Sequence, residues 1–176
     1  MTLVVETGAI VAGAESFASV AQFKTYSTNF GFSYTTLSDA QIEVALRQAT
    51  RYLTQEFRMR WKGIRVNAAQ ALDWPRSGVN TEPTSIGSRW AAYYLVPNDI
   101  VPTEVVNACI IMAQKASAGT DLFPDGTQKT IQETVGPITT KYADGSPQRV
   151  QYDAVESLLA VLLTSVGGVS VGLVRG

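Results

Sequence analysis

Apolar residues recur at helical spacing in several separate segments of this chain. In the clearest of these, residues 39–58, they fall on one face of a helix: Ile42, Ala45, Leu46, Ala49, Leu53 and Phe57. Ser38 and Gln41, three residues apart just before this run, form the pattern of a capping box. We therefore predict a helix from Asp39 to about Arg58.

Three further helices are predicted. Ser16 is the expected N-cap of a helix over residues 16–29, before a glycine that suits a helix end. Pro102 suits the first position of a helix over residues 102–117, whose apolar residues cover most of its circumference and indicate burial on nearly all sides. The last helix, residues 153–164, has its apolar positions on a single stripe: Val155, Leu158, Leu159, Leu162 and Leu163.

Short strands are expected at residues 3–5, 64–66 and 90–95. Thr130–Tyr142 alternates apolar and polar residues around Gly136-Pro137, which predicts a hairpin or a bent strand. The second and third helices are joined by roughly 40 residues rich in glycine and proline, a length that is often functional.

Together these patterns predict a mainly α fold: a small bundle of about four helices with a β-hairpin insertion, a long structured loop and an extended C-terminal tail. The 176 residues suit a single domain, residues 1–176, with its core at about 16–165 and an extension at 166–176.

The uncharged run at 158–174 is interrupted by glycines, so we expect no membrane span and no membrane partner. The N-terminus does not resemble a signal peptide.

Composition removes most catalytic chemistry. The chain has no histidine and one cysteine, Cys109, which excludes Ser-His-Asp and Cys-His pairs, histidine-ligated metals and cysteine-rich zinc clusters. A carboxylate-based enzyme is the catalytic alternative that stays open, but no pair of carboxylates stands out. We predict a protein that is not an enzyme and needs neither a cofactor nor a metal.

A basic segment is the first candidate for function. Net charge is −1, so any attraction for nucleic acid must be local. Residues 47–65 hold six of the fourteen cationic residues and one acid, with aromatic residues between them. This composition is typical of a surface for single-stranded DNA. A solvated helix face and a contact with a neighbouring subunit are the alternatives. The candidate patch is Arg47, Arg51, Arg58, Arg60 and Lys62.

The loop that carries Trp61, Trp74, Pro75 and Arg76 is the second candidate. Its indoles either cap the helical core and fix the loop, or form a docking surface, since tryptophan and arginine dominate interface hot spots.

The tail is the third candidate. Val169–Val174 follows two glycines, and Val169, Val171 and Leu173 stand at alternating positions, as in a strand. The tail therefore either joins this protein's own sheet or pairs with a partner's strand edge.

Several motifs, in order along the chain, resemble one family. They are the segment RMRWKGIRVNAAQALDWPR from Arg58 to Arg76, VVETG from Val4 to Gly8, AESF from Ala14 to Phe17, and the Ile100–Pro102 step. The chain resembles, up to about Leu163, the tailed-phage head–tail adaptor (connector or head completion) family, whose members are often catalogued as DnaT-like single-stranded-DNA-binding proteins. Phe17 stands where that family usually has tyrosine, and the region after Gly167 matches least.

The resemblance implies a homo-oligomeric ring of about twelve copies, closed by head-to-tail contacts, in the virion neck after assembly in the host cytoplasm. Its partners would be the portal protein, the stopper or tail protein and genomic DNA passing through the lumen. The implied portal-docking residues are Val169, Val171, Leu173, Val174 and Arg175. The implied loop or inter-subunit contacts are Trp61, Trp74, Pro75, Arg76, Gly136 and Pro137. The alternative is a single-stranded-DNA-binding replication protein.

Overall fold

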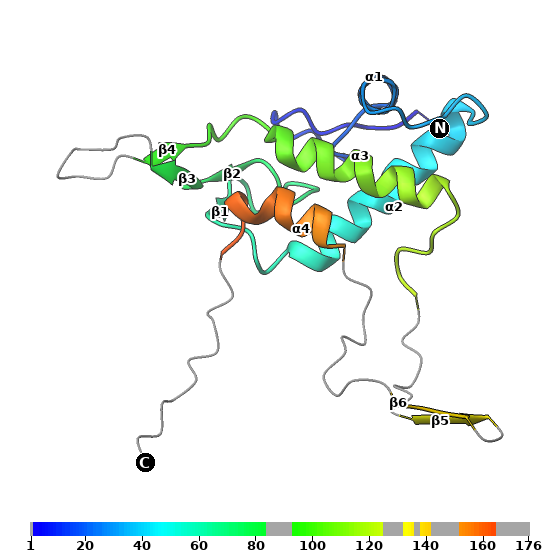
Figure 1. Ribbon diagram of the computed structural model, residues 1–176. Coiled ribbons are helices and arrows are strands. Elements are labelled where there is room, and N and C mark those ends of the chain that lie inside the picture. Colours follow the sequence, from blue (N-terminus) through cyan, green and yellow to red (C-terminus); the bar gives the residue numbers. More distant parts are fainter. Residues whose placement is uncertain (1, 84–92, 125–131, 136–137, 142–151, 165–176) are drawn as a thin grey trace, which may run out of the picture.

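Four α-helices form the body of the protein in the computed structural model, as predicted (Figure 1). The structure describes residues 2–83, 93–124, 132–135, 138–141 and 152–164. The helices are α1 (Val20–Asn29), α2 (Asp39–Phe57), α3 (Thr103–Ser117) and α4 (Asp153–Leu159), and a 3₁₀ turn, Ala160–Leu162, follows α4. The fold is mainly α.

In the described part of the chain the strands form three separate antiparallel pairs. β1 (Ile64–Arg65) pairs with β2 (Arg76–Ser77), and β3 (Asn80–Pro83) pairs with β4 (Tyr93–Leu95), both within the long connection between α2 and α3. The expected hairpin is confirmed as β5 (Gln132–Val135) and β6 (Ile138–Lys141).

The core is centred on the packing of α2 against α3, with α1 crossing above α3 and α4 packed on the other side (Figure 1). Ile42, Leu46 and Leu53 of α2 are fully buried, as their spacing predicts. Cys109 of α3 lies in this core, where its Sγ is 3.3 Å from Thr50 Oγ1, and burial raises the pKa of the thiol.

The predicted start of the first helix is wrong by one turn. Ser19, not Ser16, is the N-cap: Ser19 Oγ accepts a hydrogen bond from Gln22 N, and Gln22 Oε1 accepts one from Ser19 N. Ser16 is instead buried in extended backbone, where it forms an isolated bridge with Val5. Both serines suit a cap, but only Ser19 has glutamine three residues later. The strand expected at residues 3–5 is reduced to that single bridge.

The last helix is shorter than predicted because its end pairs with another segment. Lys62 N donates to Leu162 O at 3.0 Å, and Thr164 N donates to Arg60 O at 2.7 Å. Leu163 is consequently extended rather than helical, and forms a bridge with Trp61. At α3 the difference is small: Pro102 is the N-cap and the helix begins at Thr103.

Residues 90–92 of one expected strand, Gly136 and Pro137 of the hairpin, and the tail from residue 165 onward lie outside the described residues. The implied docking residues Val169, Val171, Leu173, Val174 and Arg175 belong to that tail. In the part of the chain that the structure describes, no helix is both long and apolar enough to cross a membrane.

Candidate nucleic-acid interface

Three of the five residues in the predicted basic patch donate hydrogen bonds within the protein, and a fourth, Arg58, forms an ion pair with Asp73. Arg47 is the first: its Nε donates to Glu15 Oε2 at 2.9 Å, and its second amino nitrogen lies 3.5 Å from Glu43. The bond from Arg47 lowers the pKa of the Glu15 carboxyl. Arg47 therefore joins α2 to the N-terminal segment.

Arg60 and Lys62 are occupied in the same way. Arg60 donates to Glu156 Oε1 at 2.8 Å, and its guanidinium also lies over the Phe57 ring. Lys62 Nζ donates to Val161 O at 2.8 Å and to Asn80 O at 3.2 Å. These two side chains connect the loop after α2 to β3 and to α4 with the turn that follows it.

Arg51 and Arg58 are the members of the patch that remain exposed. They belong to an exposed stripe along α2, spaced by three or four residues and free of acidic side chains: Gln41, Val44, Gln48, Arg51, Gln55 and Arg58. The Arg51 guanidinium lies 5.1 Å from the Phe123 ring centroid. The two arginines are about 10 Å apart along the helix.

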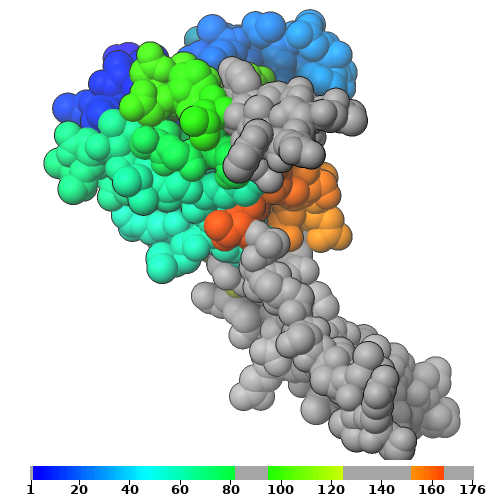
Figure 2. All heavy atoms as spheres, turned by 90° about the vertical axis from the view of Figure 1, so that its left-hand side faces the viewer, coloured from blue at the N-terminus to red at the C-terminus, as the bar shows by residue number. Residues whose placement is uncertain are grey.

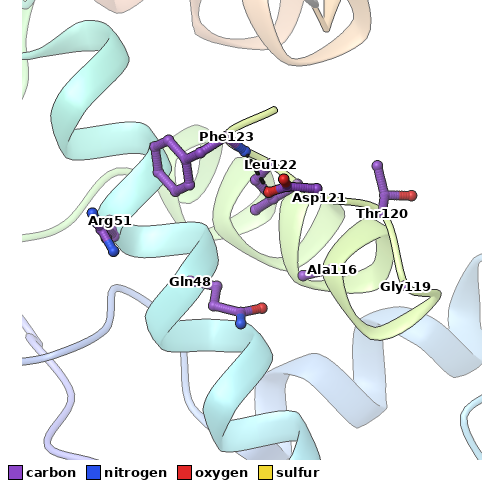
Figure 3. A pocket seen from close by; sticks show the side chains of 8 residues that line it. All are labelled: Gln48, Arg51, Ala116, Gly119, Thr120, Asp121, Leu122 and Phe123. Atoms are coloured by element: carbon purple, nitrogen blue, oxygen red, sulfur yellow. Dashed lines mark hydrogen bonds between the residues drawn. The ribbon is translucent and has the colours of Figure 1, made fainter. Parts of the chain in front are cut away.

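Arg51 borders an open cleft between α2 and the turn after α3, with a volume of about 520 Å³ (Figure 3). Gln48 reaches it from α2, and Leu122 and Phe123 form its apolar wall. In Figure 3 Asp121 lies on the far side of the Phe123 ring from Arg51, and its Oδ1 accepts a hydrogen bond from Phe123 N at 2.9 Å. The cleft offers one cation, one anion and one aromatic ring.

The tryptophan loop has its large side chains inside the protein. Trp74 is completely buried, Trp61 nearly so, and their rings meet edge to face with centroids 5.6 Å apart. Pro75 is also buried. Of the two roles that the sequence left open, the structure thus supports packing of the indoles on the core, and contact of these three residues with another chain stays a prediction.

Arg76 also has its side chain bonded within the protein. It is 7% exposed and donates to three backbone oxygens: Lys62 O at 2.8 Å, Gly63 O at 2.7 Å and Asp73 O at 3.3 Å. A guanidinium can satisfy several carbonyls in this way because its donors form a rigid fork. Arg76 closes the loop on itself, which agrees with the expected contact within the loop, while a contact with another chain stays a prediction.

Asp73 is a charged residue of this loop that the sequence analysis missed. Its side chain is 1% exposed and lies 3.5 Å from Arg58 Nε. Burial raises the pKa of the Asp73 carboxyl, while the charges of Arg58, Arg65 and Arg76 oppose that rise. The signal available in the sequence was a single acid within a basic segment.

Glu6, in the VVETG motif, has a structural role that the sequence also did not reveal. Its buried carboxylate accepts hydrogen bonds from Gly8 N at 2.8 Å, Ile10 N at 3.1 Å and Val11 N at 2.9 Å. Gly8 has a positive φ of 106° and leaves no room for a Cβ beside the backbone of Asp99. The motif thus fixes the N-terminal loop against the segment that precedes α3.

Gly136 and Pro137 are outside the described residues, so their expected contacts stay predictions. Among the residues that the structure describes, no group of three or more potential ligands is placed to hold a metal ion.

A family model described as Putative DnaT-like ssDNA binding protein matches residues 1–176. No curated protein and no solved structure matches the chain.

Proposed function

We propose that this chain, which belongs to the putative DnaT-like ssDNA binding protein family, is a structural neck protein of a tailed phage. In this proposal it forms a ring that joins the portal to the stopper or tail and continues the DNA channel. The role is architectural and involves no catalysis. DNA passing through the ring is met weakly and without sequence preference.

The use of the basic side chains is the observation that carries this proposal. Arg47, Arg60 and Lys62 bond to acids or carbonyls of their own subunit, and Arg76 is buried. Strong binding of a single strand needs a continuous positive groove with aromatic platforms. Two exposed arginines on one helix provide much less than that, whereas a scaffold needs such internal bonds to hold its loops.

The exposed apolar residues support the same proposal. Met59 and Ile64 are 92% and 72% exposed, and Leu95 is 61% exposed, although all three belong to structured segments next to the tryptophan loop. Large apolar side chains exposed to this extent are suited to protein contacts. We take them as support for a protein partner over a nucleic acid.

The test is to co-express the chain with the portal protein of the same phage and image purified complexes by electron microscopy. A ring of this protein coaxial with the portal is the expected result. Arg60→Gln is included as a variant that weakens the internal bond between Arg60 and Glu156 and leaves the exposed stripe along α2 unchanged. If no complex with the portal forms at any salt concentration, the proposal fails.

Single-stranded DNA binding is a second candidate, favoured by the description of the family and by the exposed stripe on α2. Arg51 and Arg58 have the spacing to contact two phosphates, and Phe123 lies beside Arg51 as an aromatic neighbour. This reading gives the protein a role in replication.

Fluorescence anisotropy with a labelled oligothymidylate separates the two candidates. A replication protein would bind in the nanomolar range, and Arg51→Gln with Arg58→Gln would lower its affinity and flatten its salt dependence by roughly 1.4 in log–log slope. Lys24→Gln removes a half-exposed cation of α1 that pairs with Asp39, and it is the control. An adaptor predicts affinity in the micromolar range or weaker, with little difference among these variants.

A further inference from the structure

Asp73 is a buried carboxylate that faces three arginines of the loop between α2 and β3. Its side chain is 1% exposed, and neither oxygen accepts a hydrogen bond from the residues that the structure describes. The charges that act on it are those of Arg58 at the end of α2, Arg65 in β1 and Arg76 in β2. The indole N–H of Trp61 is the neutral donor beside it. A carboxylate in such a place stays ionised only while cations compensate its charge.

The three arginines differ in how firmly they are held. Arg76 donates to three backbone oxygens and Arg65 donates to Gln70 O, so both guanidiniums are fixed within the loop. Arg58 has one ion pair among the described residues, in which its Nε lies 3.5 Å from Asp73 Oδ1. That distance is longer than a hydrogen bond, and the Arg58 side chain is 57% exposed. Arg58 is therefore the arginine that is free to leave Asp73 and meet a partner from solvent.

Arg58 stands where this loop meets the exposed stripe of α2. Figure 2 looks onto the side of the molecule where the loop (blue-green) lies at the surface, beside the end of α4 (red). A phosphate group from solvent has access to Arg58 but not to the buried Asp73. Carboxylate and phosphate are both strong acceptors for a guanidinium, so a phosphate and Asp73 compete for the same donors.

We propose that Asp73 is an internal latch on Arg58: the ionised carboxylate holds the guanidinium at the loop, and a proton on the carboxylate releases it to a phosphate of DNA. Arg65 and Arg76 keep their backbone partners, so the change is confined to Arg58. The coupling is reciprocal, because DNA that engages Arg58 favours uptake of a proton by Asp73. This inference rests on the DNA contact of the proposed function and names its regulation.

The experiment measures binding of a labelled oligothymidylate to the full chain by fluorescence anisotropy over a series of salt concentrations. Asp73→Asn mimics the protonated carboxyl and is expected to raise affinity at pH 7.5 by roughly two- to fivefold, the range of one exposed ion pair. It is also expected to steepen the log–log salt dependence by roughly 0.7, which corresponds to one added phosphate contact. In an Arg58→Gln background the same substitution is expected to change neither quantity.

Acidification tests the proton itself without a substitution at the buried site. As pH falls from 7.5 to 4.5, the affinity of wild type is expected to rise more steeply than that of Arg58→Gln and to approach that of Asp73→Asn. Burial raises the pKa of the Asp73 carboxyl, so this approach is expected at a higher pH than an exposed aspartate would give. Parallel pH profiles for wild type and Arg58→Gln contradict the latch.

Asp99→Asn is the matched control, because it removes an exposed carboxylate, with the same change in net charge, and leaves Arg58 paired. It is expected to change affinity by less than about 1.5-fold, since exposed charges are screened by salt. Circular dichroism confirms folding of every variant. The latch is overturned if Asp73→Asn gains no more than Asp99→Asn, or gains equally without Arg58, or if no variant binds DNA at any pH. Each of these results leaves the ring on the portal, which electron microscopy tests separately, intact.

Discussion

Glu6 shows how much a single side chain decides in this protein. Its carboxylate satisfies three backbone N–H groups in a loop that has no regular secondary structure. Such groups are costly when buried without a partner. The family-like motifs VVETG and AESF, and the Trp-Pro-Arg step, share this property, because each contributes side chains that hold backbone in place.

Glu6→Ala is expected to lower the free energy of unfolding by roughly 3 kcal/mol, because three N–H groups lose a charged acceptor. Urea denaturation followed by circular dichroism measures the loss. Glu6→Gln retains one oxygen acceptor and is expected to lose clearly less. Equal stability of wild type and Glu6→Ala would contradict the assigned role.

Asp73 gives the protein a predictable dependence on pH. Burial raises its pKa above the ordinary value near 3.8, so the folded state binds the proton more tightly than the unfolded chain. The contribution of Asp73 to stability is therefore highest at low pH and falls as pH rises through the folded pKa. The stability of wild type relative to Asp73→Asn should decrease between pH 3.5 and 7, as measured by urea denaturation. A constant difference across that range would contradict this assignment.

At the scale of elements, local signals determine where the longest helix begins. Ser38 Oγ accepts from Gln41 N, and Gln41 Oε1 accepts from Ser38 N, which is the capping box that the sequence predicts for α2. Ser38→Ala is expected to cost about 1 kcal/mol in thermal or urea denaturation. Ser33→Ala, in the exposed loop before α2, should be neutral. A cost below 0.3 kcal/mol would show that the cap contributes little.

The attachment of α4 depends on the loop after α2. Arg60 bonds to Glu156, and backbone bonds join residues 60–62 to residues 162–164. Arg60→Gln is therefore expected to increase amide hydrogen exchange in residues 153–162 while leaving α3 protected. Exchange measured by mass spectrometry provides the comparison, with Lys24→Gln as the control. Unchanged exchange in α4 would mean that Arg60 does not secure it.

At the scale of the whole molecule, three segments converge on Cys109. Its thiol meets Thr50 of α2 and Ser16 of the N-terminal segment, is fully buried, and has a raised pKa. Labelling by a thiol reagent is expected to be slower than in the unfolded chain by a factor of about 10³ or more, because it requires global opening. Destabilising variants such as Glu6→Ala should accelerate labelling in proportion to the increase in the unfolded population. Rapid labelling of the native protein would contradict the packing of this core.

The predictions that succeeded rest on neighbours in sequence. The four helices, the capping box of α2 and the hairpin follow from periodicity and turn residues, which act over a few positions. The two errors have different causes. Leu163 leaves the helical pattern because it pairs with Trp61, a distant residue, and that pairing has no signal within its own segment. The start of the first helix was wrong although the Ser19–Gln22 capping box is a local signal.

The sequence by itself determined a mainly α protein with a basic segment and a tryptophan-rich loop, because amphipathic spacing and composition can be read directly. Only the tertiary structure decided which charges remain available. Arg47 finds Glu15 across 32 positions, and Arg60 finds Glu156 across 96. Ion pairs form in space rather than along the chain, so a stripe that looks continuous in sequence becomes, once folded, two exposed arginines and a set of internal bonds.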